Sequence, residues 1–225
     1  MENLKYIEDN YIEIQDVIKI ANISLEKLNE LIESKLVPEP SYIVNSETII
    51  TSSLDDSHKI VFTKKYFHPV ILELIREHSE YKTPEDFKKQ FKENLLSNLK
   101  NHTQKTFAYG NVFDENNIVE TQKIDSALEE EWTYFCKGVY GICTLNNNEN
   151  DIIEKEIAIK RILNFIENKS SLNSDDKNKL QELNDEFNKS TSNFAPYQRE
   201  LSSRGKYLDK LLKEFDLEDL IKKYY

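Results

Sequence analysis

The chain has 225 residues and only 4 glycines, about a quarter of the share found in average proteins. Dinucleotide-binding and phosphate-binding loops need two or three glycines at fixed short spacings, and residues 1–109 contain none. The formal net charge of −11 repels phosphate backbones at long range. The composition therefore excludes glycine-built nucleotide sites and disfavours nucleic acid as a partner.

With 38% hydrophobic and 32% charged residues, the chain has the composition of a globular protein with its own core. No apolar run approaches the roughly 20 residues that span a bilayer, so we expect no membrane contact. The N-terminus lacks the apolar stretch of a signal peptide. Two cysteines, Cys136 and Cys143, are too few for a disulfide framework. These features predict a cytoplasmic protein.

The N-terminal region predicts a helix, a turn, a second helix and then short strands. Val17 and Ile18 begin a helical pattern that residues 22–24 interrupt. Ser24 can cap the second helix, and Pro38 prevents that helix from continuing. The β-branched and aromatic runs that follow predict three short strands, at residues 41–44, 48–51 and 59–63.

After His68 the pattern is helical. Thr83 offers a capping hydroxyl and Pro84 suits the first helical position, so a helix should begin there. Further helical patterns cover residues 124–134, 152–166, 174–187 and 196–215, while residues 101–120 predict an irregular connection. We therefore predict a mainly α protein with a winged helix-turn-helix-like unit and small antiparallel sheet at residues 1–66, followed by a helical domain at residues 67–225.

The pattern from Asp16 to Pro38 resembles the winged helix-turn-helix of the MerR class, in which a second, recognition helix leads into a proline-containing turn and a wing. The resemblance implies that residues 24–35 enter a DNA major groove. Residues 1–40, however, carry 4 lysines against 9 carboxylates. A DNA reader normally has a basic footprint, so packing or protein contact is the favoured use of this unit.

The segment from Trp132 to Cys143 concentrates rare residues: the single tryptophan, both cysteines and two of the four glycines. Six residues separate the cysteines and all four histidines lie far upstream, so we expect no metal site. A nucleophilic cysteine would need a base and a lowered pKa, and no local signature supplies them. The favoured interpretation is that Trp132, Tyr140 and Cys143 fill a core while the glycines allow a tight helix exit.

His68 and Arg199 are two further candidates. His68 precedes Pro69 at a helix start, where it could act as a base or ligand, although a capping or packing role is favoured. Arg199 could bind an anion or a phosphate-bearing ligand. An intramolecular ion-pair network is the favoured alternative, because Glu200 and Arg204 have the spacing of a helical ion pair.

Several short motifs together resemble the uncharacterised bacterial domain-of-unknown-function 6058 family. The motifs are Pro38-x-Pro40-Ser41-Tyr42, Phe67-His68-Pro69, Gly138 to Cys143 followed by Lys155-Glu156, and Phe194-Ala195-Pro196 with residues 199–204. Some members are labelled natural-product biosynthesis proteins, so the resemblance implies an association with secondary metabolism and no known reaction. Tyr197 and Gln198 stand where the family pattern would have a histidine and a glutamate, which weakens a catalytic role there.

The favoured function is a non-catalytic interaction or regulatory module whose partner is another protein or a second copy in a homodimer, and we expect no cofactor. The first alternative is an accessory enzyme or small-molecule binder, with a pocket formed by His68, Trp132, Tyr140, Cys143 and Arg199. The second alternative is a DNA-binding regulator. A concave site that joins the aromatic residues to His68 or Arg199 would favour a ligand, whereas a solid core would favour the module.

Overall fold

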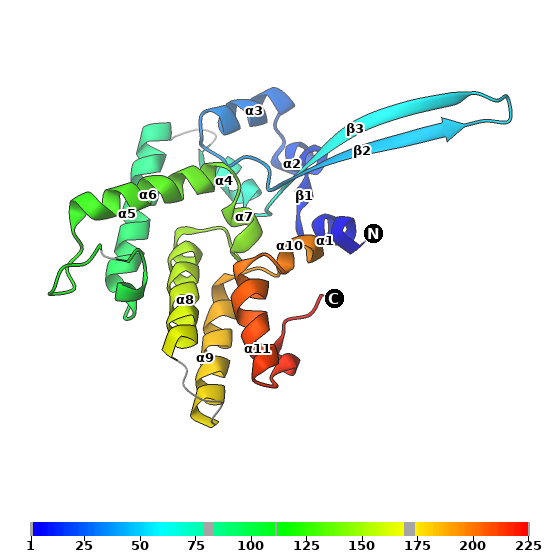
Figure 1. Ribbon diagram of the computed structural model, residues 1–225. Helices are drawn as coiled ribbons and strands as arrows, with labels where there is room; N and C mark the ends of the chain where they lie inside the picture. Colours follow the sequence, from blue (N-terminus) through cyan, green and yellow to red (C-terminus); the bar gives the residue numbers. More distant parts are fainter. Residues whose placement is uncertain (1, 79–82, 111, 169–173, 225) are drawn as a thin grey trace.

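The computed structural model describes residues 2–78, 83–110, 112–168 and 174–224. Helices dominate, and one small antiparallel sheet projects from them (Figure 1). This confirms the prediction of a mainly α protein with a small sheet. Among the described residues, no helix has both the length and the apolar character needed to cross a bilayer.

The chain begins with α1 (Glu2–Asn10), the two-residue strand β1 (Ile12–Glu13), α2 (Ile14–Ala21) and α3 (Leu25–Glu33). The turn after α2 forms because Asn22 adopts the left-handed conformation, with φ of 53°. Ser24 caps α3 as predicted, since its Oγ accepts a hydrogen bond from the Lys27 amide at 3.1 Å. Local sequence signals therefore specify this helix pair.

The sheet consists mainly of one long hairpin, β2 (Tyr42–Thr51) and β3 (Ser57–Phe67), to which β1 adds two residues at the base. We name residues 43–65 the arm, which extends away from the helices (Figure 1). The prediction of three short strands was wrong, because the first two of them lie in the single continuous strand β2. Residues 45–47 were interpreted as a turn, but polar side chains are compatible with a strand that faces solvent.

The central helices are α4 (Ile71–His78), α5 (Pro84–Asn101), α6 (Thr121–Cys136), α7 (Tyr140–Cys143) and α8 (Glu149–Asn168), with a 3₁₀ turn η1 (Lys105–Phe107) between α5 and α6. Thr83 caps α5 as predicted, accepting from the Asp86 amide at 3.2 Å. One apolar core joins these helices to α2 and α3, and it includes the fully buried Val17, Leu28 and Leu95. The predicted boundary after residue 66 stays a prediction.

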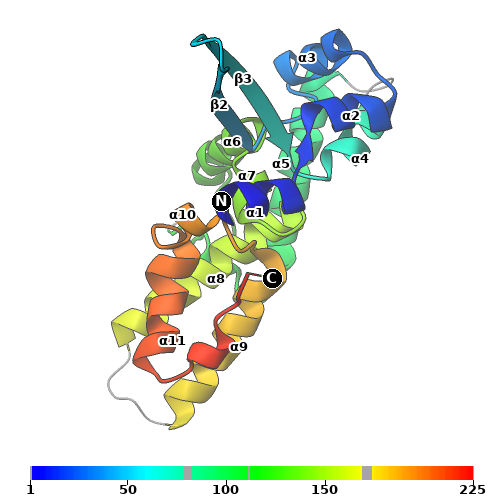
Figure 2. The same ribbon diagram turned by 90° about the vertical axis from the view of Figure 1, so that its right-hand side faces the viewer.

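The C-terminal elements are α9 (Ser174–Ser190), α10 (Pro196–Arg199), the π-helical turn η2 (Arg204–Asp209), α11 (Lys210–Glu214) and the 3₁₀ turn η3 (Glu218–Leu220). They form a second apolar core with the end of α8 around Phe187, Leu208 and Phe215. Figure 2 shows the C-terminal helices α9 and α11 and the arm at opposite ends of the molecule. The helical region expected from residue 196 onward is thus divided into short segments.

Gly138 and Gly141 allow the N-terminal unit to approach the helices around α7. Gly138 has φ of 69°, and a Cβ there would collide with the Glu39 carbonyl. A Cβ on Gly141 would collide with the Ser41 hydroxyl. The Ser41 Oγ donates to the Gly138 carbonyl at 3.1 Å, so the two segments are also hydrogen-bonded.

Candidate functional site

Parts of the four motifs that carry the family resemblance meet at α7, where we define a junction between the N-terminal unit and the helices. Besides the Ser41 contact, the Tyr11 hydroxyl donates to the Gly141 carbonyl at 3.0 Å. Ser192, just before the Phe194 motif, donates to the carbonyl of Ile142. The polar groups named here have partners within the protein, so the junction has the character of a structural contact.

His68 lies at this junction, and both of its ring nitrogens are engaged. Nδ1 accepts from the Val70 amide at 3.2 Å, and Nε2 lies 3.2 Å from the Leu145 carbonyl, to which it can donate. Burial lowers the pKa of the ring, which favours the neutral tautomer that these two contacts require. This arrangement matches the packing role that the sequence favours.

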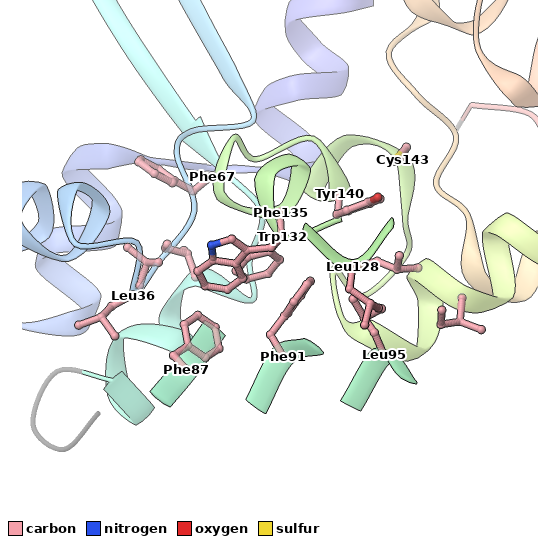
Figure 3. Packing of buried hydrophobic residues seen from close by; sticks show 14 of the residues in the cluster. Leu36, Phe67, Phe87, Phe91, Leu95, Leu128, Trp132, Phe135, Tyr140 and Cys143 are labelled. Carbon is pink, nitrogen blue, oxygen red and sulfur yellow. The ribbon is translucent and has the colours of Figure 1, made fainter. Parts of the chain in front are cut away.

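Trp132 is buried in a cluster of aromatic side chains (Figure 3). Its ring centroid lies 5.2 Å from that of Phe91, 5.3 Å from that of Phe87 and 5.8 Å from that of Phe135. These edge and stacked contacts are typical of a close-packed core. Trp132 therefore lies in a solid part of the structure, away from the lining of the pocket described below.

Arg199 lies elsewhere, in a groove of about 920 Å³ between α1, α10 and the C-terminal segment. Its guanidinium makes two hydrogen bonds to the Asp209 carboxylate, of 2.7 and 3.1 Å. The expected pairing of Glu200 with Arg204 was wrong. Arg204 is completely buried and donates instead to Ser192, Asn188 and Thr191, because η2 turns its side chain toward the end of α9.

Tyr140 belongs to a different site, and Cys143 lies beside that site through its contact with Lys155. Tyr140 lines a pocket of about 310 Å³ between α6, α8 and the loop before residue 110, and neither His68, Trp132 nor Arg199 lines it. The complete lining consists of Tyr109, Ala127, Glu130, Glu131, Tyr134, Val139, Tyr140, Lys155 and Glu156. We name it the Glu131 pocket. The structure thus separates the five predicted site residues into four places: the junction, the aromatic cluster, the groove of Arg199 and the Glu131 pocket.

Glu131 is the unusual residue of this pocket, because only 8% of it is exposed. Burial raises the pKa of its carboxyl to about 7, and the nearby Glu156 carboxylate acts in the same direction. The Tyr109 hydroxyl faces it and opposes the shift. The hydroxyl and the carboxyl thus interact with each other, but neither the hydroxyl nor Glu131 Oε2 makes a hydrogen bond of good geometry to any other described residue. The pocket therefore contains buried polar atoms with unused bonding capacity.

Lys155 and Cys143 form the other polar pair beside the pocket. Desolvation lowers the pKa of Lys155, but Cys143, Glu156 and Glu131 together raise it above its ordinary value, so the ammonium stays charged. Burial raises the pKa of the Cys143 thiol. A protonated thiol and a charged ammonium are both poor nucleophiles. The pair consequently favours binding chemistry over covalent catalysis.

Sequence reasoning missed Glu131 and Tyr109 as site residues. Glu131 follows Leu128 by three residues and precedes Phe135 by four, so it lies on the buried stripe of α6, and this spacing could have identified it. Lys155 and Glu156 stand in a family motif but were not interpreted as site residues. Within the described ranges, no three histidine, cysteine or carboxylate residues lie close enough together to hold a metal ion.

Comparison with known proteins identifies a family. Residues 87–216 match the model of a family of unknown function, DUF6058. This range includes the Glu131 pocket and Arg199 and begins after the arm. Neither the curated proteins nor the solved structures contain a match. Because the match covers more than half of the chain, the protein belongs to the DUF6058 family.

Proposed function

We propose that the protein is a non-catalytic interaction module that associates with a second copy of itself through the arm. The observation that carries this proposal is the row of apolar side chains exposed along β2 and β3. Leu54 at the tip is 85% exposed, Ile50 51%, Phe62 40% and Ile60 39%. A contiguous apolar surface of this kind is typical of a protein-binding site.

The register of the hairpin divides the arm into two unlike faces. Ser46 lies opposite Phe62, Thr48 opposite Ile60, and Ile50 opposite His58, so these side chains share one face. We name it the apolar face. The other face also exposes apolar side chains, Ile43, Ile49 and Val61, but it carries a Glu47–Lys59 ion pair and a hydrogen bond from Thr63 to Asn45 as well. A contact through that face would remove the ion pair from water, so the apolar face is better suited to an interface without trapped water.

The arm lacks support from the rest of the sheet along most of its length. β1 pairs only with Tyr66 and Phe67, so both edges of the ribbon are open beyond the base. An isolated two-stranded hairpin is marginally stable in water, and open edges with apolar residues favour association. A partner that covers the arm would stabilise the hairpin and would bury its open edges and apolar side chains.

The charges of the arm favour a second copy as that partner. Residues 43–65 contain three carboxylates and three lysines, whereas the whole chain carries −11. Two arms can therefore approach without the repulsion that opposes contact between the bodies. At about 3.4 Å per residue each arm is about 35 Å long. Two such faces would bury roughly 1,000–1,200 Å², at the lower end of specific interfaces, which indicates reversible association.

The MerR-like helix pair supports the same proposal over DNA binding. In α3, the exposed side chains include Glu26, Glu30 and Glu33. The single lysine of that helix, Lys27, lies 3.5 Å from Glu30 and is thus paired. An acidic helix cannot provide the basic footprint that phosphate contacts require. Salt-sensitive binding of duplex DNA by the intact chain would favour the regulator instead.

Sedimentation equilibrium of the intact chain tests the proposal. We expect a reversible dimer, and we expect the double variant Ile60→Thr, Phe62→Thr to be a folded monomer. Val61→Thr is the matched control, because Val61 is 65% exposed on the opposite face. A monomeric wild type at about 100 µM, or a double variant that dimerises as the wild type does, would contradict the proposal.

A further inference from the structure

We propose that the Glu131 pocket binds a small organic ammonium ion, with a primary amine as its preferred head group. The proposal concerns a site remote from the arm and does not depend on dimerisation. It rests on the charge of the lining, on its aromatic rings and on the facing oxygens of Glu131 and Tyr109, which accept no hydrogen bond of good geometry from the described residues.

The residues that line the pocket include more acidic than basic side chains. Glu130, Glu131 and Glu156 contribute three carboxyl groups, while Lys155 contributes the one ammonium. That ammonium is already engaged with the Cys143 sulfur and the neighbouring carboxylates. An anionic ligand would therefore meet net repulsion, whereas a cation would be attracted.

Three tyrosines complete the pocket, and their rings suit a cation. Tyr109, Tyr134 and Tyr140 all line it. The Lys155 Nζ lies 5.6 Å from the centroid of the Tyr140 ring, so one of these rings already accepts an ammonium group. Aromatic rings together with carboxylates are the usual means by which proteins recognise ammonium ligands.

The facing oxygens of Glu131 and Tyr109 specify a hydrogen-bond donor. The Tyr109 hydroxyl lies against the Glu131 carboxyl, but the hydroxyl oxygen and Glu131 Oε2 accept no hydrogen bond of good geometry from any described residue. Both oxygens are buried and can accept further hydrogen bonds. A primary ammonium carries three N–H donors and could satisfy both oxygens, which a quaternary ammonium could not. The volume of about 310 Å³ limits the ligand to a small molecule.

The backbone supports a preformed site. Glu131 and Lys155 lie on the long helices α6 and α8, which hold their positions relative to the pocket. Tyr109 adopts a left-handed conformation, with φ of 54°, which is strained for a residue with a large side chain. Strain of this kind is concentrated at binding sites.

Binding should depend on pH because only the carboxylate form of Glu131 attracts a cation. The charged and titratable groups that face Glu131 are Tyr109, Glu130, Tyr134, Cys143, Lys155 and Glu156. Its pKa of about 7 means that the carboxyl ionises between about pH 6 and 8. Affinity for an amine that stays protonated over this range should therefore rise with pH.

Calorimetric titration of the intact chain with butylamine, tetramethylammonium and butyrate tests the proposal. We expect butylamine to bind more tightly than tetramethylammonium, and butyrate not to bind. Glu131→Gln should weaken butylamine binding at least about tenfold, equivalent to about 1.4 kcal/mol. Glu115→Gln, in an exposed loop, changes the net charge equally and should leave binding unchanged.

Glu156→Gln provides a second variant, at the partly exposed side of the pocket, and should also weaken butylamine binding. Folding of each variant is checked by circular dichroism. Absence of butylamine binding by the wild type at about pH 8, equal binding of butyrate, or unchanged affinity in folded Glu131→Gln would overturn the proposal.

Discussion

The arm and the Glu131 pocket depart in opposite directions from the usual distribution of side chains. The arm exposes Ile50, Ile60 and Phe62 to solvent, whereas the pocket encloses the carboxyl of Glu131. The first arrangement leaves apolar area in water, and the second removes a charge from it. Each costs free energy in the isolated chain, and each cost would fall if something outside the chain were bound.

The aromatic cluster around Trp132 shows the ordinary distribution against which these two regions differ. Trp132 packs on three phenylalanine rings in the first core (Figure 3). It requires nothing from outside the chain. The cluster stabilises the fold, whereas the arm exposes apolar side chains and the pocket encloses a carboxyl group that a proposed partner or ligand would cover.

The largest effect is expected for Trp132→Ala, which removes a buried aromatic ring from the cluster. The free energy of unfolding should fall by about 3–5 kcal/mol, because the lost contacts leave a cavity. Chemical denaturation measures the change. Phe62→Ala on the arm is the comparison variant, and a loss as large as that of Trp132→Ala would show that the arm is instead part of the folded core.

Glu131→Gln should have the next largest effect, with a characteristic pH dependence. The folded-state pKa of about 7 lies above the ordinary value of 4.5, so the contribution of Glu131 to stability is present below pH 4.5 and lost as pH rises through 7. The loss amounts to about 3 kcal/mol. Glutamine does not ionise. The free energy of unfolding of the variant should therefore rise by this amount relative to that of the wild type as the pH increases from about 4.5 to about 8.

Thermal or chemical denaturation of both proteins across this pH range provides the measurement, since other titrating groups cancel in the difference. Glu115→Gln again controls for the change of net charge. A constant difference between wild type and Glu131→Gln would show that the carboxyl is not desolvated. A variant that is more stable yet binds amine less well would identify Glu131 as a residue retained for binding.

A smaller effect is expected when salt is added to the dimer. The bodies carry like charge, −11 for each chain, and the arm contact is apolar. Raising ionic strength screens the repulsion, so the dissociation constant should fall a few-fold between about 0.05 and 0.5 M salt. Sedimentation at several salt concentrations measures this. Weaker association in high salt would indicate that ion pairs hold the copies together.

Local features of the fold were accessible from sequence, and features that depend on distant partners were not. Ser24 and Thr83 cap their helices as expected, because a cap depends on residues within one turn. The partners of Arg204 could not be predicted, since Asn188 and Thr191 lie in a different element. The sequence did not predict that residues 45–47 continue the strand. They are polar, and a strand that is exposed to solvent on both faces does not need alternating apolar residues.

The same distinction applies to the candidate site. Tyr140 and Cys143 were identified from a segment of rare residues, and both lie at or beside the pocket. Glu131 is one of three consecutive glutamates and was not predicted as a site residue. Only its position on the buried stripe of α6 distinguishes it from the other two. Its proximity to Tyr109 arises from a loop with no periodic pattern, so sequence alone could not bring the two together.

Amide hydrogen exchange as a function of protein concentration tests most directly whether a second copy covers the arm. If it does, exchange in residues 43–65 should slow as the concentration rises from about 1 to about 100 µM, while exchange in the core helices stays constant. The double variant Ile60→Thr, Phe62→Thr should show no such slowing. Exchange in the wild-type arm that is fast and independent of concentration would contradict the account.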